Sequence, residues 1–238
     1  MIEKVLKPPK KAFGGIAFLR IKALFDTYGE NIELYIQRVN GRITALFGAY
    51  QSGFSLCAEP LADYNELQSF FLFLRAEVFC EAHVAEKFCG FKKTECNIVR
   101  LTEALSGNVS HAKISNVYFA LQKGEDGDIS LPPFDLWYTD FCLRFNHNAA
   151  EYALTENAVA VCGFMTEKAS LITGVAVDPE KRGKGLGKKA VADLVTAIKQ
   201  KYNKSEIFAA CTDEKLPFYE KCGFSYCEKC AVLRYGSV

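Results

Sequence analysis

The 238-residue sequence has few histidines, almost no net charge and no long apolar run. Its three histidines, His83, His111 and His147, are far apart and near no cysteine pair, so we expect packed or solvated imidazoles rather than metal ligands. The 29 basic and 28 acidic side chains nearly cancel, so bulk charge does not steer this chain to nucleic acid or to an anionic membrane. No apolar run is long enough for a signal peptide or a spanning helix. We therefore expect a cytoplasmic protein with no nucleic-acid or membrane partner.

The ten cysteines are scattered along the chain, which fits a reducing compartment where cysteine packs as a small apolar residue. One pair, Cys227 and Cys230, has the C-x-x-C spacing of a metal or redox site, and Cys222 is close in sequence. A structural zinc site usually needs four ligands, and no second pair with matching spacing is present. The surrounding segment GFSYCEKCAVLRY alternates in polarity as a strand does. We therefore predict a closing strand and no metal site.

Internal similarity indicates two related halves. Residues 86–91 (EKFCGF) are echoed by residues 219–224 (YEKCGF), and an apolar, strand-like tail follows both. Upstream, residues 32–50 and 151–165 each resemble two strands joined at a turn that contains asparagine. Half of the residues are apolar, enough for two small cores, and small polar residues near 106–115 suggest a boundary. We predict two copies of one α/β unit, residues 1–105 and 106–238, against the alternative of a chance resemblance.

The second half has a predicted order of elements. Residues 116–122 (NVYFALQ) resemble a strand, residues 123–133 a loop, and residues 134–145 (FDLWYTDFCLRF) an amphipathic helix. A strand, a strand, a long strand, a helix, a strand, a helix and a strand should follow. Trp137, Tyr138, Asp140 and Phe141 lie on this predicted helix. Aromatic spacing of this kind is more typical of a hydrophobic core than of a ligand pocket.

The most specific feature is a glycine-rich junction between a strand and a helix in residues 170–202. The string RGKGLG, residues 182–187, opens the helix, where backbone N–H groups have no partner and the helix dipole favours anions. Arg182, Lys184, Lys188 and Lys189 add positive charge. Each glycine inside a helical segment costs about 0.5–1 kcal/mol relative to alanine, so the cluster requires a reason. We predict a site for phosphate oxygens, the alternative being a flexible helix start without a ligand.

The junction lacks the G-x-x-x-x-G-K-[ST] pattern of a Walker loop and fits a dinucleotide fingerprint poorly. It resembles the [QR]-x-x-G-x-[GA] pyrophosphate loop of the GNAT superfamily of N-acetyltransferases, met by Arg182, Gly185 and Gly187 after the V-x-P turn at Val177. Residues 216–224 (LPFYEKCGF) are similar to the family's second signature. The resemblance covers residues 135–238 well and residues 13–104 as a degenerate copy. It implies a tandem GNAT-like α/β fold, with two similar halves built on central mixed β-sheets flanked by helices.

The resemblance also implies an activity. A GNAT enzyme transfers an acetyl group directly from acetyl-CoA to a primary amine, on a small molecule or a peptide, without a metal. Tyr219 matches the tyrosine near the CoA sulfur, and a phenol with a pKa of about 10 can protonate a departing thiolate. Thr212 stands where the family often has asparagine, which weakens that correspondence. The resemblance assigns the cofactor to Gly174, Val175, Ala176, Val177, Arg182, Gly183, Lys184, Gly185, Leu186, Gly187, Lys188 and Thr212.

Several alternatives stay open at this stage. The first half lacks arginine and glycine after Glu59-Pro60, so it should not bind CoA and instead shapes a wall of the substrate cleft. Glu151, Glu167 or a water chain could take the proton of the amine, and both carboxylates are interpreted as solvated. A catalytically silent CoA-binding or regulatory module and an ATP-binding domain are the competing functions. None of these motifs specifies the acceptor, the acyl-chain length or the oligomeric state.

Overall fold

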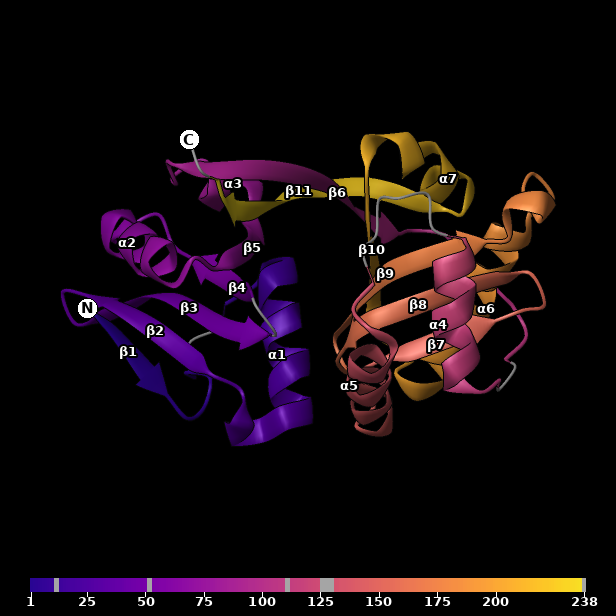
Figure 1. The fold of residues 1–238 in the computed structure, drawn as a ribbon, viewed down its shortest axis with the longest axis horizontal. Helices are drawn as coiled ribbons and strands as arrows, with labels where there is room; N and C mark the ends of the chain where they lie inside the picture. The colour runs from indigo at the N-terminus through magenta and orange to yellow at the C-terminus, as the bar shows by residue number, and fades with distance from the viewer. Residues whose placement is uncertain (11–12, 51–52, 110–111, 125–130, 237–238) are drawn as a thin grey trace. The chain divides into compact units, whose positions relative to one another are not determined.

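The computed structural model describes the chain except for residues 11–12, 51–52, 110–111, 125–130 and 237–238. The described residues form two compact units (Figure 1). Unit 1 comprises residues 1–97 and 228–238, and unit 2 comprises residues 98–227. The sequence predicts a division between residues 105 and 106, so the two divisions differ. The difference arises from two strands. The strand at residues 91–101, which ends the first half of the sequence, extends into unit 2, and the strand at residues 224–235, which ends the second half, extends into unit 1.

Unit 1 is a mixed sheet with the strand order β1-β2-β3-β4-β5-β11, accompanied by helices. Neighbouring strands are antiparallel except for β4 and β5, which are parallel. Asn40 and Gly41 have positive φ angles between β2 and β3, which confirms the predicted asparagine turn. The elements of unit 1 are β1 (Ile2–Val5), α1 (Gly15–Tyr28), η1 (Gly29–Asn31), β2 (Leu34–Val39), β3 (Arg42–Tyr50), β4 (Gly53–Ala58), α2 (Tyr64–Leu74), β5 (Glu77–Glu81), α3 (Ala82–Ala85), the first part of β6 (Phe91–Leu101) and the last part of β11 (Phe224–Tyr235).

The core of unit 1 is rich in phenylalanine. On α2, Leu67 and Phe71 are fully buried one turn apart, the spacing that aims a helix stripe at a sheet. The ring of Phe71 lies 5.3 Å from that of Phe47 on β3 and 5.5 Å from that of Phe54 on β4. Full burial of such a side chain stabilises the fold by roughly 1.5–3 kcal/mol. These contacts give unit 1 a hydrophobic core of its own.

Unit 2 is a mixed sheet with the strand order β6-β10-β9-β8-β7, covered by helices on both faces. Helix α6 packs Val191, Leu194 and Ile198 on one face, and α4 and α5 pack Val117 and Phe141 on the other. Strands β7, β8 and β9 are antiparallel, whereas β9 and β10 are parallel. The elements are the last part of β6, α4 (Ile114–Lys123), α5 (Phe134–Asn146), β7 (Glu151–Leu154), β8 (Ala158–Met165), β9 (Ala169–Val177), η2 (Pro179–Lys181), α6 (Leu186–Lys201), β10 (Glu206–Cys211), η3 (Asp213–Lys215), α7 (Leu216–Lys221) and the first part of β11.

The structure confirms the predicted order from β7 to β11 and the helix at residues 134–145, but the strand predicted at residues 116–122 is wrong. This segment forms α4, in which Val117 and Leu121 are buried at helical spacing while Phe119 is 55% exposed. A strand would have turned Val117 and Phe119 to the same face. Most of the predicted loop at 123–133 lies outside the described residues.

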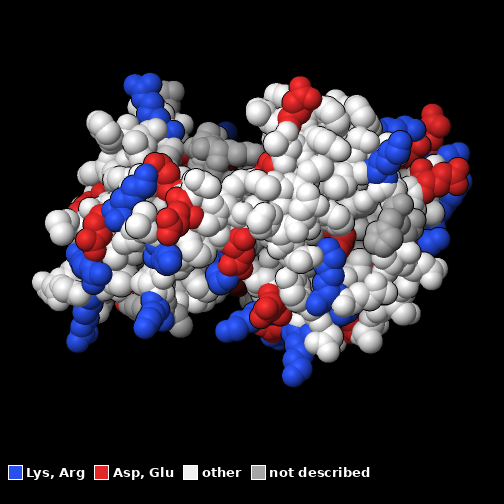
Figure 2. All heavy atoms as spheres, turned by 90° about the horizontal axis from the view of Figure 1, so that it is seen from below, with Lys and Arg blue, Asp and Glu red and all other residues white. Residues whose placement is uncertain are grey.

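The charges on the surface reflect the near balance of 29 basic and 28 acidic side chains. Lysine and arginine side chains are interspersed with acidic side chains on the face drawn in Figure 2. Within the described residues, no helix is both long enough and apolar enough to span a membrane.

Candidate active site

Strands β9 and β10 separate part-way along their length. Their parallel ladder runs from Ala169 opposite Glu206 to Ile172 opposite Ala209. Strand β9 continues to Val177 and stays paired with β8 on its other side, up to Val177 opposite Ala158. Along residues 173–177, therefore, the described ladder gives the backbone edge that faces β10 no strand partner, and before Val177 this edge can receive a ligand.

A pair of β-bulges lies where the two strands separate. The register between β8 and β9 shifts on either side of Cys162, so that Thr173 is inserted in β9 and Gly163 in β8. A bulge bends a strand and increases its twist. Thr173 is the exposed position of β9, whereas Leu171, Ile172 and Gly174 around it are buried. The bend thus coincides with the end of the β9–β10 ladder and turns one hydroxyl outward.

The glycine-rich junction follows β9 directly. Gly183 and Gly185 have φ angles of 79° and 74°, the left-handed region that favours glycine, and Gly185 caps α6 without a side-chain acceptor for the first N–H groups of the helix. A Cβ atom added to either residue would meet no heavy atom within 4 Å. Gly187 differs, because its added Cβ would lie 3.1 Å from the Phe218 ring and 3.2 Å from the Val177 side chain. Two glycines therefore keep the backbone accessible, and the third allows close packing.

Basic side chains surround this junction. Arg182 donates from Nη2 to the carbonyl oxygen of Gly124 at 3.1 Å and from Nε to that of Val177 at 3.4 Å. Lys188 donates to the carbonyl oxygen of Lys221 at 2.7 Å, and Lys184 is exposed. The arrangement brings several positive charges close to the N-terminus of α6, where an anion is favoured by the helix dipole as well.

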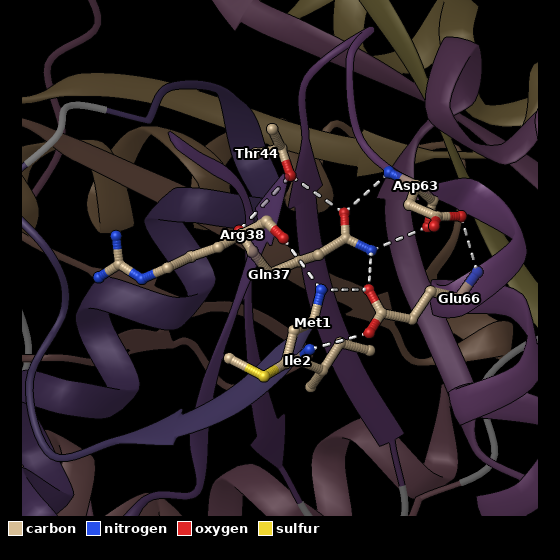
Figure 3. Close-up of polar contacts among 7 residues, drawn as sticks. All are labelled: Met1, Ile2, Gln37, Arg38, Thr44, Asp63 and Glu66. Carbon is tan, nitrogen blue, oxygen red and sulfur yellow. Dashed lines mark hydrogen bonds and ion pairs between the residues drawn. The ribbon is translucent and has the colours of Figure 1, made fainter. Parts of the chain in front are cut away.

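The corresponding helix start in unit 1 is closed by its own side chains (Figure 3). Asp63 caps α2 and accepts a hydrogen bond from the Glu66 N–H at 3.0 Å. The Glu66 carboxylate accepts from the Ile2 N–H at 3.0 Å and from Nε2 of the fully buried Gln37 at 2.8 Å. Gln37 also accepts from the Asp63 N–H at 2.9 Å and from Thr44 Oγ1 at 3.0 Å. Carboxylates thus fill the place that the glycine-rich junction leaves open in unit 2.

Tyr219 lies on α7 and is buried, with 5% of its surface exposed. Its ring contacts those of Phe218 and Phe224, with centroids 5.1 and 5.6 Å apart. Burial raises the pKa of the Tyr219 phenol well above its usual value, and the thiols of Cys211 and Cys222 act in the same direction. The phenol therefore keeps its proton at any physiological pH. Thr212, between β10 and η3, is exposed.

Glu151 and Glu167, the two carboxylates considered as general bases, differ in burial. Glu151 is buried, forms a 2.8 Å ion pair with Lys201 and accepts from the Tyr152 N–H at 2.9 Å, so its interpretation as a solvated carboxylate is wrong. No local pattern in the sequence indicates this ion pair, because Lys201 is distant in sequence. Glu167 is exposed in the turn between β8 and β9.

The C-x-x-C pair lies within strand β11, where Cys227 is exposed and Cys230 is buried. Among the residues that the structure describes, no three histidine, cysteine, aspartate or glutamate side chains form a group that could hold a metal ion.

Comparison with known proteins assigns unit 2 to a protein family. A family model described as an acetyltransferase (GNAT) domain matches residues 147–226, which include β8, β9, the glycine-rich junction, β10 and α7. Unit 2 carries a GNAT acetyltransferase domain. The domain belongs to a family of acyl-transferring proteins, and the matched range includes Arg182 and Tyr219. A search of curated proteins finds no match.

Solved structures show that the GNAT fold extends over the whole chain. A GNAT-family acetyltransferase from Colwellia psychrerythraea, 9% identical, aligns over 99% of this chain and 100% of its own with a TM-score of 0.55. A GCN5-related N-acetyltransferase from Kribbella flavida, 10% identical, aligns over 93% and 95% with a TM-score of 0.57. A tandem GNAT protein from the clavulanic acid biosynthesis pathway, determined without AcCoA and also 10% identical, aligns over 87% and 84% with a TM-score of 0.51. The predicted tandem GNAT-like α/β fold is thus confirmed.

The fold brings most of the sequence-predicted site residues to one end of unit 2. Val175, Ala176 and Val177 lie on the free part of β9, residues 182–188 follow them, and Thr212 continues from the end of β10. Sequence reasoning missed the bulge at Thr173, for which the only signal was a lone threonine within the apolar run LITGVAV.

Proposed function

We propose that unit 2 binds acetyl-CoA and transfers its acetyl group to a primary amine, of a small molecule or a peptide, in the cytoplasm. The observation that carries the proposal is the separation of β9 from β10 immediately before the glycine-rich start of α6. One open strand edge and one open helix N-terminus, joined by a short turn, suit a ligand with an extended polar arm attached to a pyrophosphate.

The residues present fit this ligand. At Gly183 and Gly185 an added Cβ would project into open space, so phosphate oxygens can reach the backbone N–H groups between them. Arg182 and Lys184 would supply positive charge to the pyrophosphate. Amide groups of the arm would pair with the backbone of Val175 in the way a strand would, next to Val177, whose carbonyl accepts from Arg182. Unit 1 offers none of these features at α2, because Asp63 and Glu66 occupy that helix start.

Each group of the chain then has a defined task. When bound, acetyl-CoA supplies an acetyl group activated as a thioester. The amine nitrogen forms a bond to the acetyl carbon, the carbon–sulfur bond breaks, and the sulfur needs a proton. Tyr219 is the proton donor in this proposal, because it stands where the sequence resembles the family tyrosine near the CoA sulfur; its phenol, whose pKa is raised by burial, carries the proton at neutral pH. Glu151 is held by Lys201 and Glu167 is exposed in the turn between β8 and β9; in this proposal the proton that the amine loses passes to water.

Calorimetric titration with acetyl-CoA, with ATP and NAD as controls, tests the proposal first. We expect saturable binding of acetyl-CoA and none of the controls. A panel of polyamines, amino sugars, amino acids and peptides with free N-termini then tests transfer, followed by mass spectrometry. If acetyl-CoA does not bind, the site is not an acyl-CoA site; if it binds and no amine is acetylated, the chain is a silent CoA-binding module.

A further inference from the structure

A buried arginine lies behind the bulges of β8 and β9. Arg144 on α5 is 6% exposed, and its guanidinium pairs with Asp140, one helical turn earlier. Its Cζ atom lies 5.4 Å from the centroid of the Phe164 ring and 5.9 Å from that of Phe141. Removing a guanidinium and a carboxylate from water costs several kcal/mol per ion, and well-packed apolar residues often stabilise a core equally well. A buried pair at this position therefore calls for a reason other than stability.

The guanidinium contacts the bulge itself. Nη1 of Arg144 donates a hydrogen bond to the carbonyl oxygen of Gly163, the inserted residue of β8. An inserted residue has no opposite residue in the ladder, so its backbone groups need partners from elsewhere. Arg144 supplies that partner from the helix that covers this face of the sheet.

Gly163 and Thr173 are coupled across the two strands. A Cβ atom added to Gly163 would lie 2.6 Å from Thr173 Oγ1, closer than real Cβ contacts, and 3.0 Å from its Cγ2 atom, closer than most of them. Gly163 therefore packs directly against Thr173, the inserted residue next to which the ladder between β9 and β10 ends. These two contacts connect Arg144 on α5 to the residue that precedes the free part of β9.

We propose that Arg144 is a positioning residue for the arm of acetyl-CoA: it holds the Gly163 carbonyl and thereby sets the course of β9 beyond Thr173. The inference rests on the proposed function of unit 2. It predicts a selective defect, because the glycine-rich junction is formed by a different segment. Loss of Arg144 should weaken binding of the arm and leave binding of the nucleotide part unchanged.

The test compares two ligands by calorimetry. Acetyl-CoA has both the arm and the nucleotide, whereas 3′-phospho-ADP has the nucleotide alone. For Arg144→Met we expect the Kd of acetyl-CoA to rise about tenfold, the change that follows from about 1.4 kcal/mol of lost binding energy, and the Kd of 3′-phospho-ADP to stay within twofold. Arg144→Lys retains one donor for the Gly163 carbonyl and should restore part of the affinity for acetyl-CoA.

A second variant alters the bulge at Gly163 and leaves Arg144 unchanged. Gly163→Ala keeps Arg144 but forces a methyl group against Thr173, so the same selective defect is expected even if Arg144→Met does not fold. The matched control is Lys201→Met, which removes an ion pair with Glu151 and a cation–π contact 4.5 Å from Phe145 without touching the bulge. We expect this control to bind both ligands normally.

The outcomes separate the two proposals. Equal weakening of both ligands in Arg144→Met and Gly163→Ala, or normal acetyl-CoA binding by both folded variants, overturns the positioning role and leaves the proposed function intact. A wild-type protein that binds neither ligand overturns both.

Discussion

Replacing Gly185 with glutamate should abolish most of the affinity for acetyl-CoA. Gly185 is the N-cap of α6, has a φ angle of 74°, and has open space where a Cβ atom would project. A carboxylate about 5 Å from a phosphate oxygen repels it by about 1 kcal/mol in bulk water and about 3 kcal/mol at the effective dielectric constant near a protein surface. Since 1.4 kcal/mol corresponds to tenfold, we expect the Kd to rise roughly 5- to 140-fold.

Two variants separate repulsion from backbone strain. Gly185→Ala imposes the same left-handed strain, about 1–2 kcal/mol of fold stability, without the charge. Gly90→Glu places glutamate at an equal φ angle of 74°, also in open space, but in unit 1. Calorimetry should show that only Gly185→Glu loses affinity, and that the loss shrinks at high salt because the charges are exposed. If Gly185→Glu and Gly185→Ala bind acetyl-CoA equally well, no phosphate lies at this helix start.

Three further predictions concern other parts of the chain. Tyr219→Phe should lower kcat about 100-fold, within the range for loss of a general acid, with an unchanged Kd for acetyl-CoA; an unchanged kcat excludes Tyr219 as the proton donor. Burial raises the pKa of Glu81, so its contribution to stability is present below the unfolded value of 4.5 and is lost as the pH rises through the folded pKa. Glu81→Gln should therefore raise Tm relative to wild type at pH 8 and not at pH 4, and an equal difference at both pH values contradicts this. A fragment of residues 106–238 lacks the part of β6 that borders β10 and should give a collapsed NMR spectrum, whereas residues 98–227 should give a dispersed one.

The sequence predicted those elements whose signal is contained in a short window. The Asn40-Gly41 turn, the closing strand around Cys227 and the glycine-rich start of α6 each depend on residues within one turn or one strand. Helix α4 shows the limit of such reasoning. Its tyrosine and phenylalanine favour a strand locally, but the burial of Val117 and Leu121 against the sheet decides in favour of a helix.

Two features depend on partners far away in sequence and could not be predicted in this way. An apolar closing strand has the same pattern whichever sheet it joins, so nothing in residues 98–101 indicates that they border β10. The local sequence does not show that Thr173 is an inserted residue of β9. The insertion depends on the register with β8, where Gly163 is bonded to Arg144 on α5. Sequence motifs thus predicted the phosphate end of the candidate site, whereas the geometry of its strand edge required coordinates.

The strand order explains how a half without a phosphate site contributes to the candidate site. Strand β10 borders β9 on one side and β6 on the other, and this part of β6 comes from the first half of the sequence. Val99 of β6 is fully buried in the same core as Ile207 and Ala209 of β10, so β6 packs with β10 on the side away from the separation. The end of β6 therefore supports a strand that borders the candidate site, although the rest of the first half carries a closed helix start at Asp63.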